Sequence, residues 1–195
     1  MSPILGIYAS QISGHLFAPS GAYDSIATNT ITSGGTSSIT FSSIPSTYTH
    51  LQLRCITKAA DTALGYNAFA FRFNGDTGSN YVAHQFAGNG GSVISSYTAA
   101  TTSMTVGYTT VSHPDYTNVF ASTVVDILDY ANTNKYTTMR SLSGNDLNDG
   151  SVSSRIRLGS GLWLNTSAIN SITILDTSST FTQYTQFALY GIKGN

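Results

Sequence analysis

The feature that most constrains the fold of this chain is a strict alternation of side chains in its clearest segment. Between residues 67 and 74, phenylalanines occupy positions 69, 71 and 73, and small, polar or charged residues occupy the positions between them. A period of two is the period of a β-strand, in which successive side chains point to opposite faces. The Asn74-Gly75-Asp76 sequence that follows is a strong turn signal. We therefore expect a strand whose phenylalanines lie in the core.

The composition extends this expectation to the whole chain. Of the 195 residues, 28 are Ser and 27 are Thr, and all nine acidic residues are Asp. Such a chain is poor in the straight-chain residues that favour helices and rich in the β-branched and aromatic residues that favour strands. Further short strands, divided by turn residues, are expected at 26–32, 37–41, 48–58, 119–130, 135–142, 155–164, 171–175 and 181–192, with the weakest alternation at 92–111. The segment 81–86 fits either a strand or a single helical turn.

About nine or ten short strands with turn chemistry between them are typical of one antiparallel domain. We predict an all-β fold, an antiparallel β-sandwich that is jelly-roll-like and is formed by residues 24–195. The segments 26–32 and 37–41 flank Ser33-Gly34-Gly35-Thr36, which predicts a hairpin. The segment 119–130 carries apolar residues on both faces, as in a strand between two covered surfaces, so its strand is expected to lie centrally.

Residues 1–23 differ from the rest and are predicted to form an extended N-terminal arm. The arm carries no Lys, Arg, Asp or Glu and has no clear period. Burying a large apolar side chain stabilises by roughly 1.5–3 kcal/mol, so we expect these side chains to lie on the domain or on a neighbour. The seven apolar residues concerned are Ile4, Leu5, Ile7, Tyr8, Ile12, Leu16 and Phe17.

Charge and cysteine content argue against several function classes. Eight basic residues are scattered among nine acidic ones, the net charge is -1, and a phosphate-neutralising patch for nucleic acid is not expected. The apolar runs are too short to span a bilayer, and no basic residue precedes Arg54 to begin a secretory leader. The single cysteine allows no internal disulfide and no thiolate cage. No metal or cofactor is expected, since no histidine within a predicted strand has a second His, Cys or Asp two residues away on the same face.

Two short motifs resemble the paired catalytic motifs of two-lobed aspartic proteases. They are Asp76-Thr77-Gly78 and Asp176-Thr177-Ser178, one hundred residues apart. Those enzymes place each aspartate directly after a buried strand so that two carboxylates share a proton, and only the second motif has that setting. In a chain this rich in Ser and Thr, such tripeptides arise by chance. We interpret both as turn or strand-end aspartates.

A pair of carboxylates for sugar hydrolysis is not indicated either. Asp126 and Asp129 are the only close internal pair in a predicted strand, and residues three apart on a strand point to opposite faces. Asp126 is expected to contact a buried basic partner such as Arg140 or Arg155. We therefore predict that the protein is not an enzyme and has no catalytic residues.

A binding function remains. Trp163 alternates with two leucines and is interpreted either as a core or subunit-interface residue or as a platform on which a sugar stacks. The loop 144–150 supplies Asn145, Asp146 and Asp149, whose amide and carboxylate groups could contact sugar hydroxyls. The same oxygens could hold a cation, but the EF-hand spacing is missing, so a hydrated turn is the favoured interpretation.

Four segments together resemble structural proteins of tailed bacteriophages, especially phages of aquatic bacteria such as cyanobacteria. The segments are GIYASQISGHL (6–16), FSSIPSTY (41–48), FNGDTGSNY (73–81) and FALYGIKG (187–194). The resemblance covers nearly the whole chain, and its motifs are turns and strand ends. It implies an antiparallel sandwich that serves as a capsid decoration, or cement, protein or as part of a tail appendage, with no catalytic residue carried over.

From this resemblance we expect a non-enzymatic virion protein that binds and stabilises the lattice of the major capsid protein. The segment from Ile4 to Phe17 is predicted to dock on the capsid protein, another virion protein or a neighbouring subunit, and a homo-oligomer, in particular a trimer, is expected. The alternative is a tail fibre or receptor-binding domain that recognises host cell-surface polysaccharide. In that alternative, Trp163 and the 144–150 loop contact the sugar.

Overall fold

The structure is a computed structural model that describes residues 21–62, 66–111, 117–147 and 154–194. In these ranges every regular element is a strand, and there is no helix that could cross a membrane. The strands are β1 (Tyr23–Thr30), β2 (Ser38–Phe41), β3 (His50–Ala59), β4 (Tyr66–Phe73), β5 (Tyr81–Gly88), β6 (Val93–Thr101), β7 (Met104–Val111), β8 (Ala121–Leu128), β9 (Thr137–Asn145), β10 (Arg155–Trp163), β11 (Ile172–Asp176) and β12 (Gln186–Ile192).

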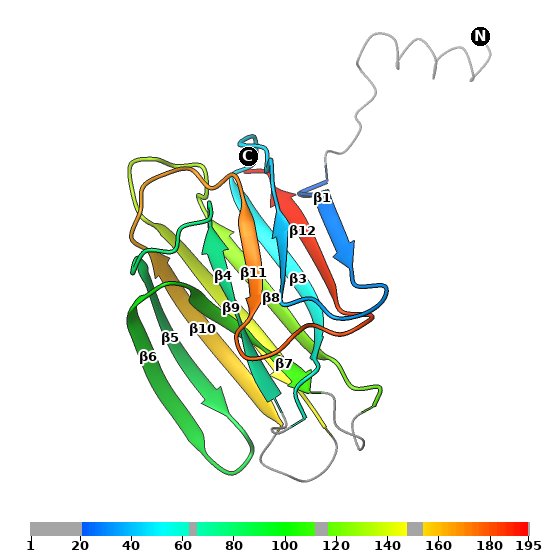
Figure 1. The fold of residues 1–195 in the computed structure, drawn as a ribbon. Helices are drawn as coiled ribbons and strands as arrows, with labels where there is room; N and C mark the ends of the chain where they lie inside the picture. Colours follow the sequence, from blue (N-terminus) through cyan, green and yellow to red (C-terminus); the bar gives the residue numbers. More distant parts are fainter. Residues whose placement is uncertain (1–20, 63–65, 112–116, 148–153, 195) are drawn as a thin grey trace, which may run out of the picture.

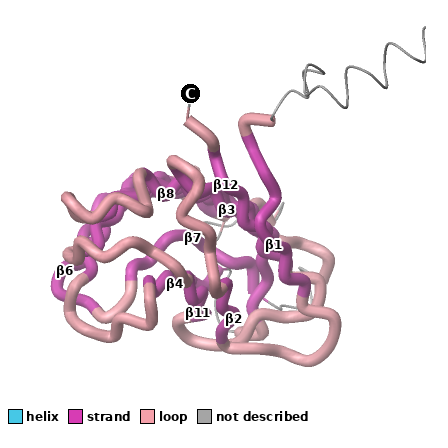
Figure 2. The backbone as a smooth tube through the Cα atoms, turned by 90° about the horizontal axis from the view of Figure 1, so that it is seen from above, coloured by secondary structure: helices cyan, strands magenta, loops and turns pink. Residues whose placement is uncertain are grey.

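The twelve strands belong to one hydrogen-bonded sheet. Its main path runs β2-β11-β4-β7-β3-β8-β9-β10-β5-β6, while β12 pairs with β3 and β1 pairs with β12. All pairs are antiparallel except β3 with β7, which are joined in parallel only at Lys58 and Ala59. The sheet thus has a wide part (β1, β12, β3, β8, β9, β10, β5, β6) and a narrow part (β2, β11, β4, β7). Figure 1 shows β4 and β11 in front of β8 and β9. In Figure 2, β4 and β11 lie on a separate level from β3, β8 and β12.

The core lies between the two parts. Phe69, Phe71 and Phe73 of β4 are all 0% exposed, which confirms the prediction made from their alternation. Opposite them, β3 contributes Leu51 and Leu53 from its inner face, and both are also fully buried. Aromatic rings meet edge to face in this layer, an arrangement that aromatic side chains favour when packed. The inner face of the wide part therefore packs against the narrow part.

The all-β, largely antiparallel fold agrees with the sequence-based prediction, and the jelly-roll-like sandwich arrangement stays a prediction. The expected hairpin of 26–32 with 37–41 is wrong. β1 pairs with β12 and β2 pairs with β11, so the turn at Gly34 connects the wide part to the narrow part. This pairing buries Ile39 and Phe41 beside the isoleucines of β11, a contact that a local hairpin would not supply.

The weakly alternating segment 92–111 forms two strands. β6 lies at the edge of the sheet and is exposed along most of its length, whereas most of β7 is buried. Neither setting produces a one-sided pattern, which explains the weak alternation. The strand in the 119–130 segment lies between β3 and β9, as predicted, and its apolar outer face is covered by no described part of the chain.

Candidate functional site

The candidate site is a row of exposed apolar side chains on the outer face of the wide part. Strand register places Val124 of β8 beside Leu142 of β9, Leu142 beside Leu158 of β10, and Leu158 beside Phe86 of β5. Their exposed fractions are 40%, 54%, 57% and 58%, in that order. Ile56 of β3 and Ile156 of β10 extend this surface. Ile156 lies two residues before Leu158, and Ile56 lies two residues beyond Arg54, which pairs with Val124. We call this set of six the apolar row: Val124, Leu142, Leu158, Phe86, Ile56 and Ile156.

The alternation that fills the core also produces this row. In β9, Met139 and two serines face inward and are buried, while Arg140 and Leu142 between them face outward. The same holds in β10, where buried Arg157 separates Ile156 from Leu158. Because side chains alternate in a strand, the residues between the inward ones form the outer face, and in these strands that face carries large apolar side chains. Contiguous exposed apolar surface of this kind marks interaction sites.

A polar row runs alongside the apolar row and is held by hydrogen bonds. Asp126 of β8 accepts from Gln52 Nε2 through Oδ1 at 2.8 Å and from Arg140 Nε through Oδ2 at 3.0 Å. Arg54 Nε donates to Gln52 Oε1 at 3.0 Å, and the Arg54 guanidinium lies 5.1 Å from the Tyr190 ring centroid. The predicted contact of Asp126 with Arg140 is confirmed, but the expectation of a buried partner is wrong, because the Arg140 side chain is 71% exposed. Both oxygens of the Asp126 carboxylate therefore accept hydrogen bonds from neighbouring side chains, rather than facing a substrate.

Two shallow hollows open on this outer face. One, of about 470 Å³, is lined by His84, Phe86, Arg140, Leu158 and Ser160, among others. The second, of about 220 Å³, lies over Val124, Leu142 and Ile156. His84 stacks on Tyr97 of β6, with ring centroids 5.6 Å apart. An apolar centre with a polar rim is the anatomy of protein interfaces.

The predicted sugar-contact residues do not come together. Trp163 is 1% exposed, donates from Nε1 to Asp76 Oδ2 at 2.8 Å and stacks on Tyr81, so the platform interpretation is wrong and the core interpretation is confirmed. Its ring lies at the end of β10 opposite to the 144–150 loop, because Trp163 pairs with Thr137 and Arg155 with Asn145. A large indole ring flanked by apolar residues is drawn into the core, where Asp76 satisfies its one polar group.

The 144–150 loop is described only in part. Asn145 is 4% exposed, and its Oδ1 accepts from the backbone N–H of Arg155 at 3.2 Å. Asn145 and the exposed Asp146 line an open hollow of about 570 Å³ together with Phe120 and Arg155. Asp149 lies outside the described residues. The burial of Asn145 follows from its place at the end of β9, where the side chain points inward.

The two Asp motifs lie toward opposite ends of β4. Asp76 follows Phe73 in a turn, and its pKa is lowered by hydrogen bonds from Asn80, Trp163 and the Gly78 backbone N–H. Asp176 pairs with Phe69 across the sheet, and burial raises its pKa although Asn67 and two backbone N–H groups donate to it. Among the described residues the two carboxylates share no partner, and the interpretation of Asp76 as a turn residue and of Asp176 as a strand-end residue is confirmed.

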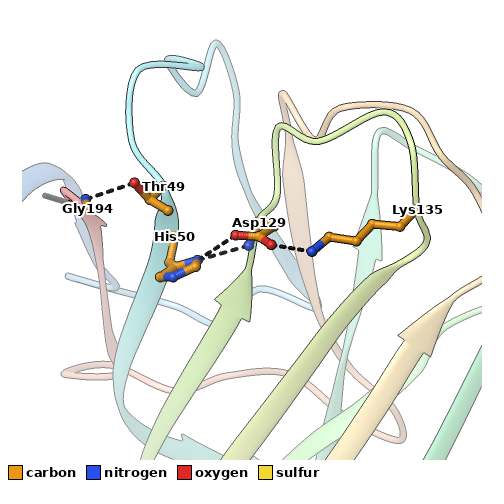
Figure 3. A network of polar contacts seen from close by, with 5 residues as sticks. All are labelled: Thr49, His50, Asp129, Lys135 and Gly194. Carbon is orange, nitrogen blue, oxygen red and sulfur yellow. Dashed lines mark hydrogen bonds and ion pairs between the residues drawn. The ribbon is translucent and has the colours of Figure 1, made fainter.

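A polar network ties the end of β8 to the start of β3 (Figure 3). The backbone N–H of Asp129 donates to His50 Nδ1 at 3.0 Å, and the Asp129 carboxylate contacts Lys135. The Lys135 ammonium holds the pKa of the Asp129 carboxyl below its ordinary value. Nearby, the Gly194 backbone N–H donates to Thr49 Oγ1 at 2.8 Å. These contacts fasten a turn; in the ranges that the structure describes, no three His, Cys or Asp side chains gather as a metal site.

The docking residues predicted from the sequence differ from those of the apolar row. The arm residues lie outside the described residues: Ile4, Leu5, Ile7, Tyr8, Ile12, Leu16 and Phe17. The apolar row was missed, although one signal pointed to it: the segment 119–130 is apolar on both faces. Apolar residues on both faces of a strand favour one that is covered on both sides. A strand whose apolar outer face is left uncovered has the same sequence pattern.

The comparisons with known proteins leave the chain without an assigned family. No family model matches the sequence, and no curated protein matches it. Among solved structures, a protein of unknown function from Shewanella oneidensis MR-1 is 10% identical over 100% of this chain and 96% of its own, with a TM-score of 0.19. A likeness at that TM-score carries nothing over to this chain.

Proposed function

We propose that this protein is a non-enzymatic structural component of a virion, a capsid decoration protein that binds the major capsid protein lattice. The observation that carries the proposal is the apolar row, an apolar stripe across five adjacent strands that no described residue covers. The phage resemblance of the sequence motifs supplies the identity of the partner. In the same proposal the folded-over sheet is a jelly-roll-like sandwich, and the protein acts as a trimer.

The strength of such a contact follows from the exposed fractions. Full burial of a Val, Leu or Phe side chain stabilises by roughly 1.5–3 kcal/mol, and the four central members of the apolar row are each about half exposed. Covering them would therefore contribute roughly 3–6 kcal/mol. Association itself costs about 4–15 kcal/mol, so one row holds a partner weakly and requires further contacts. In this proposal the further contacts come from the repeating capsid lattice and from a second attachment by the arm, from Ile4 to Phe17. Several weak contacts made at once then give a stable attachment.

The test is occupancy on particles from which the chain has been deleted. Purified protein is added to such particles, and bound protein is measured against free concentration for the wild type and for the double variant Leu142→Thr, Leu158→Thr. Leu164→Thr is the matched control, since Leu164 is 40% exposed and lies about 20 Å along the strand from Leu158.

We expect the wild type and the control to saturate alike, and the double variant to bind at least about tenfold more weakly, because it loses about 1.4 kcal/mol or more of apolar contact. Equal occupancy of all three proteins would reject the apolar row as the docking face. A protein that fails to bind particles at all would reject decoration.

The second candidate function is recognition of host polysaccharide by a tail appendage. The hollow lined by Phe86, His84 and Arg140 favours it, since exposed aromatic rings beside polar groups are suited to stacking on sugars. Binding of the isolated protein to a glycan array, abolished by Tyr97→Ala, would support this function over decoration. A blank array with intact particle binding would eliminate it.

A further inference from the structure

Arg157 is a buried arginine whose described contacts are all neutral. It lies on the inner face of β10 and is 1% exposed. Its Nε donates to Gln85 Oε1 at 2.7 Å and its Nη2 to the Thr105 carbonyl at 3.1 Å, while buried Nη1 has no hydrogen-bond partner among the described residues. The guanidinium lies 5.7 Å from the Tyr108 ring centroid. No ion pair between Arg157 and a described carboxylate is found.

This arrangement leaves a positive charge uncompensated inside the protein. Burial lowers the pKa of the Arg157 guanidinium, but an arginine keeps its proton at any ordinary pH. A buried charge is costly unless it is paired and hydrogen-bonded, and the two neutral acceptors and one ring satisfy Arg157 only in part. The physical remedy is a negative charge brought to the guanidinium.

A small cavity with the Arg157 side chain in its lining is available for that charge. Its volume is about 70 Å³, and it opens between the β5–β6 hairpin and β7. Its lining includes Gln85, Ser96, Thr98 and Thr105, of which Gln85 is fixed: its Nε2 donates to Ser96 Oγ at 2.7 Å, and its Oε1 accepts from the Tyr108 hydroxyl at 3.1 Å. A water molecule takes about 30 Å³ in the liquid, so the cavity admits a halide ion or a carboxylate group and excludes larger anions.

A second buried polar atom lies near Arg157 Nη1 on the β9 side of the guanidinium, and it is not part of the cavity lining. Ser141 Oγ of β9 has no hydrogen-bond partner. A Cβ on Gly159 would lie 2.6 Å from Ser141 Oγ and 2.9 Å from Arg157 Nη1, so both atoms border the space that this glycine leaves free. The hydroxyl is a donor, as is the guanidinium, and both suit an acceptor that carries negative charge.

We propose that Arg157 and the cavity beside it bind a small monovalent anion such as chloride or formate. The anion neutralises the guanidinium and links the β5–β6 hairpin to β7 and β10. Because Gln85 lies between His84 and Phe86 on β5, the bound anion also fixes the strand that carries one end of the apolar row. This site is independent of the proposed virion function.

The test measures thermal unfolding at constant ionic strength while sodium gluconate is replaced by sodium chloride or sodium formate. Gluconate is too large for the cavity. We expect the unfolding midpoint of the wild type to rise and saturate, by about 3–6 °C at a tenfold excess over Kd. The rise should be absent in Arg157→Met and retained in Arg72→Met, the matched control, whose arginine also donates to a backbone carbonyl.

A second measurement decides the matter if Arg157→Met does not fold. Wild-type crystals grown in bromide should show anomalous density in contact with the Arg157 guanidinium. A wild-type midpoint that does not depend on the anion, together with crystals that show water at this position, would overturn the proposal. So would an anion-dependent rise that persists in a folded Arg157→Met protein.

Discussion

Replacing Asp76 by Asn tests the reasoning on the Trp163 end of the core. Asp76 Oδ2 accepts from Trp163 Nε1 and Asn80 Nδ2, and Oδ1 accepts from the Gly78 backbone N–H, at 2.8–2.9 Å. An asparagine has a single acceptor oxygen, so its best orientation keeps the first two donors and turns its own NH₂ toward Gly78. The retained bonds also lose their charge.

The magnitude follows from the kinds of hydrogen bond involved. Bonds to a charged group contribute about 1.5–3 kcal/mol and neutral ones about 0.5–1.5 kcal/mol, so each of the two retained bonds weakens by about 1 kcal/mol. Water replaces the exposed Gly78 contact at small cost. We expect Asp76→Asn to lower the free energy of unfolding by about 2 kcal/mol near pH 7, measured by urea unfolding with Trp163 fluorescence.

The pH dependence gives this prediction its sign. The folded-state pKa of Asp76 is lowered by its bond from Asn80, against opposing desolvation, with Trp163 and Gly78 contributing further. A lowered pKa stabilises the folded state above the unfolded value of 3.8, and that contribution is lost as pH falls through the folded value. The difference between wild type and Asp76→Asn should therefore shrink toward zero in acid. A difference that is negligible at neutral pH, or that does not change with pH, refutes the reasoning; Asp24→Asn, which breaks an exposed pair with Lys193, is the control and should leave stability unchanged.

Three further predictions concern other parts of the molecule. Gly191→Ala should destabilise by about 1–3 kcal/mol in urea, because a Cβ there would lie 2.3 Å from the Tyr48 ring, and an unaltered midpoint would contradict this packing. Leu142→Thr and Leu158→Thr should each change the free energy of unfolding by no more than about 0.5 kcal/mol, because both side chains are exposed; a larger loss would mean that the apolar row is structural. Burial raises the pKa of the Cys55 thiol, so the folded protein should resist a thiol-modifying reagent and the unfolded protein should react fully; rapid reaction of the folded protein would place Cys55 at the surface.

Local patterns in the sequence predicted the strands better than their partners. The alternation at 69, 71 and 73 predicted a buried face correctly, because a period of two is a property of the strand itself. Pairing was not predictable from such patterns. The glycines at 34 and 35 suggested a local hairpin, yet β1 and β2 pair with strands near the other end of the chain. Those partners are separated by more than 130 residues, and no local signal specifies them.

The candidate site was missed for a related reason. Composition and motifs direct attention to Trp163 and to the Asn- and Asp-rich loop, whereas the structure buries Trp163 and leaves Leu142 and Leu158 exposed. A single leucine in an alternating strand is not informative. Four strands in register turn such residues into a continuous surface, and register is a tertiary property.

We propose that the protein acts by docking the outer face of the wide part of its sheet onto the capsid protein lattice. The most direct measurement is an electron cryomicroscopy reconstruction of the virion to which we propose the chain belongs, at a resolution that orients its strands. We predict that β8, β9 and β10 face the capsid shell, with Leu142 and Leu158 covered by a capsid protein. Density in which this face points to solvent while another surface contacts the shell would contradict the account.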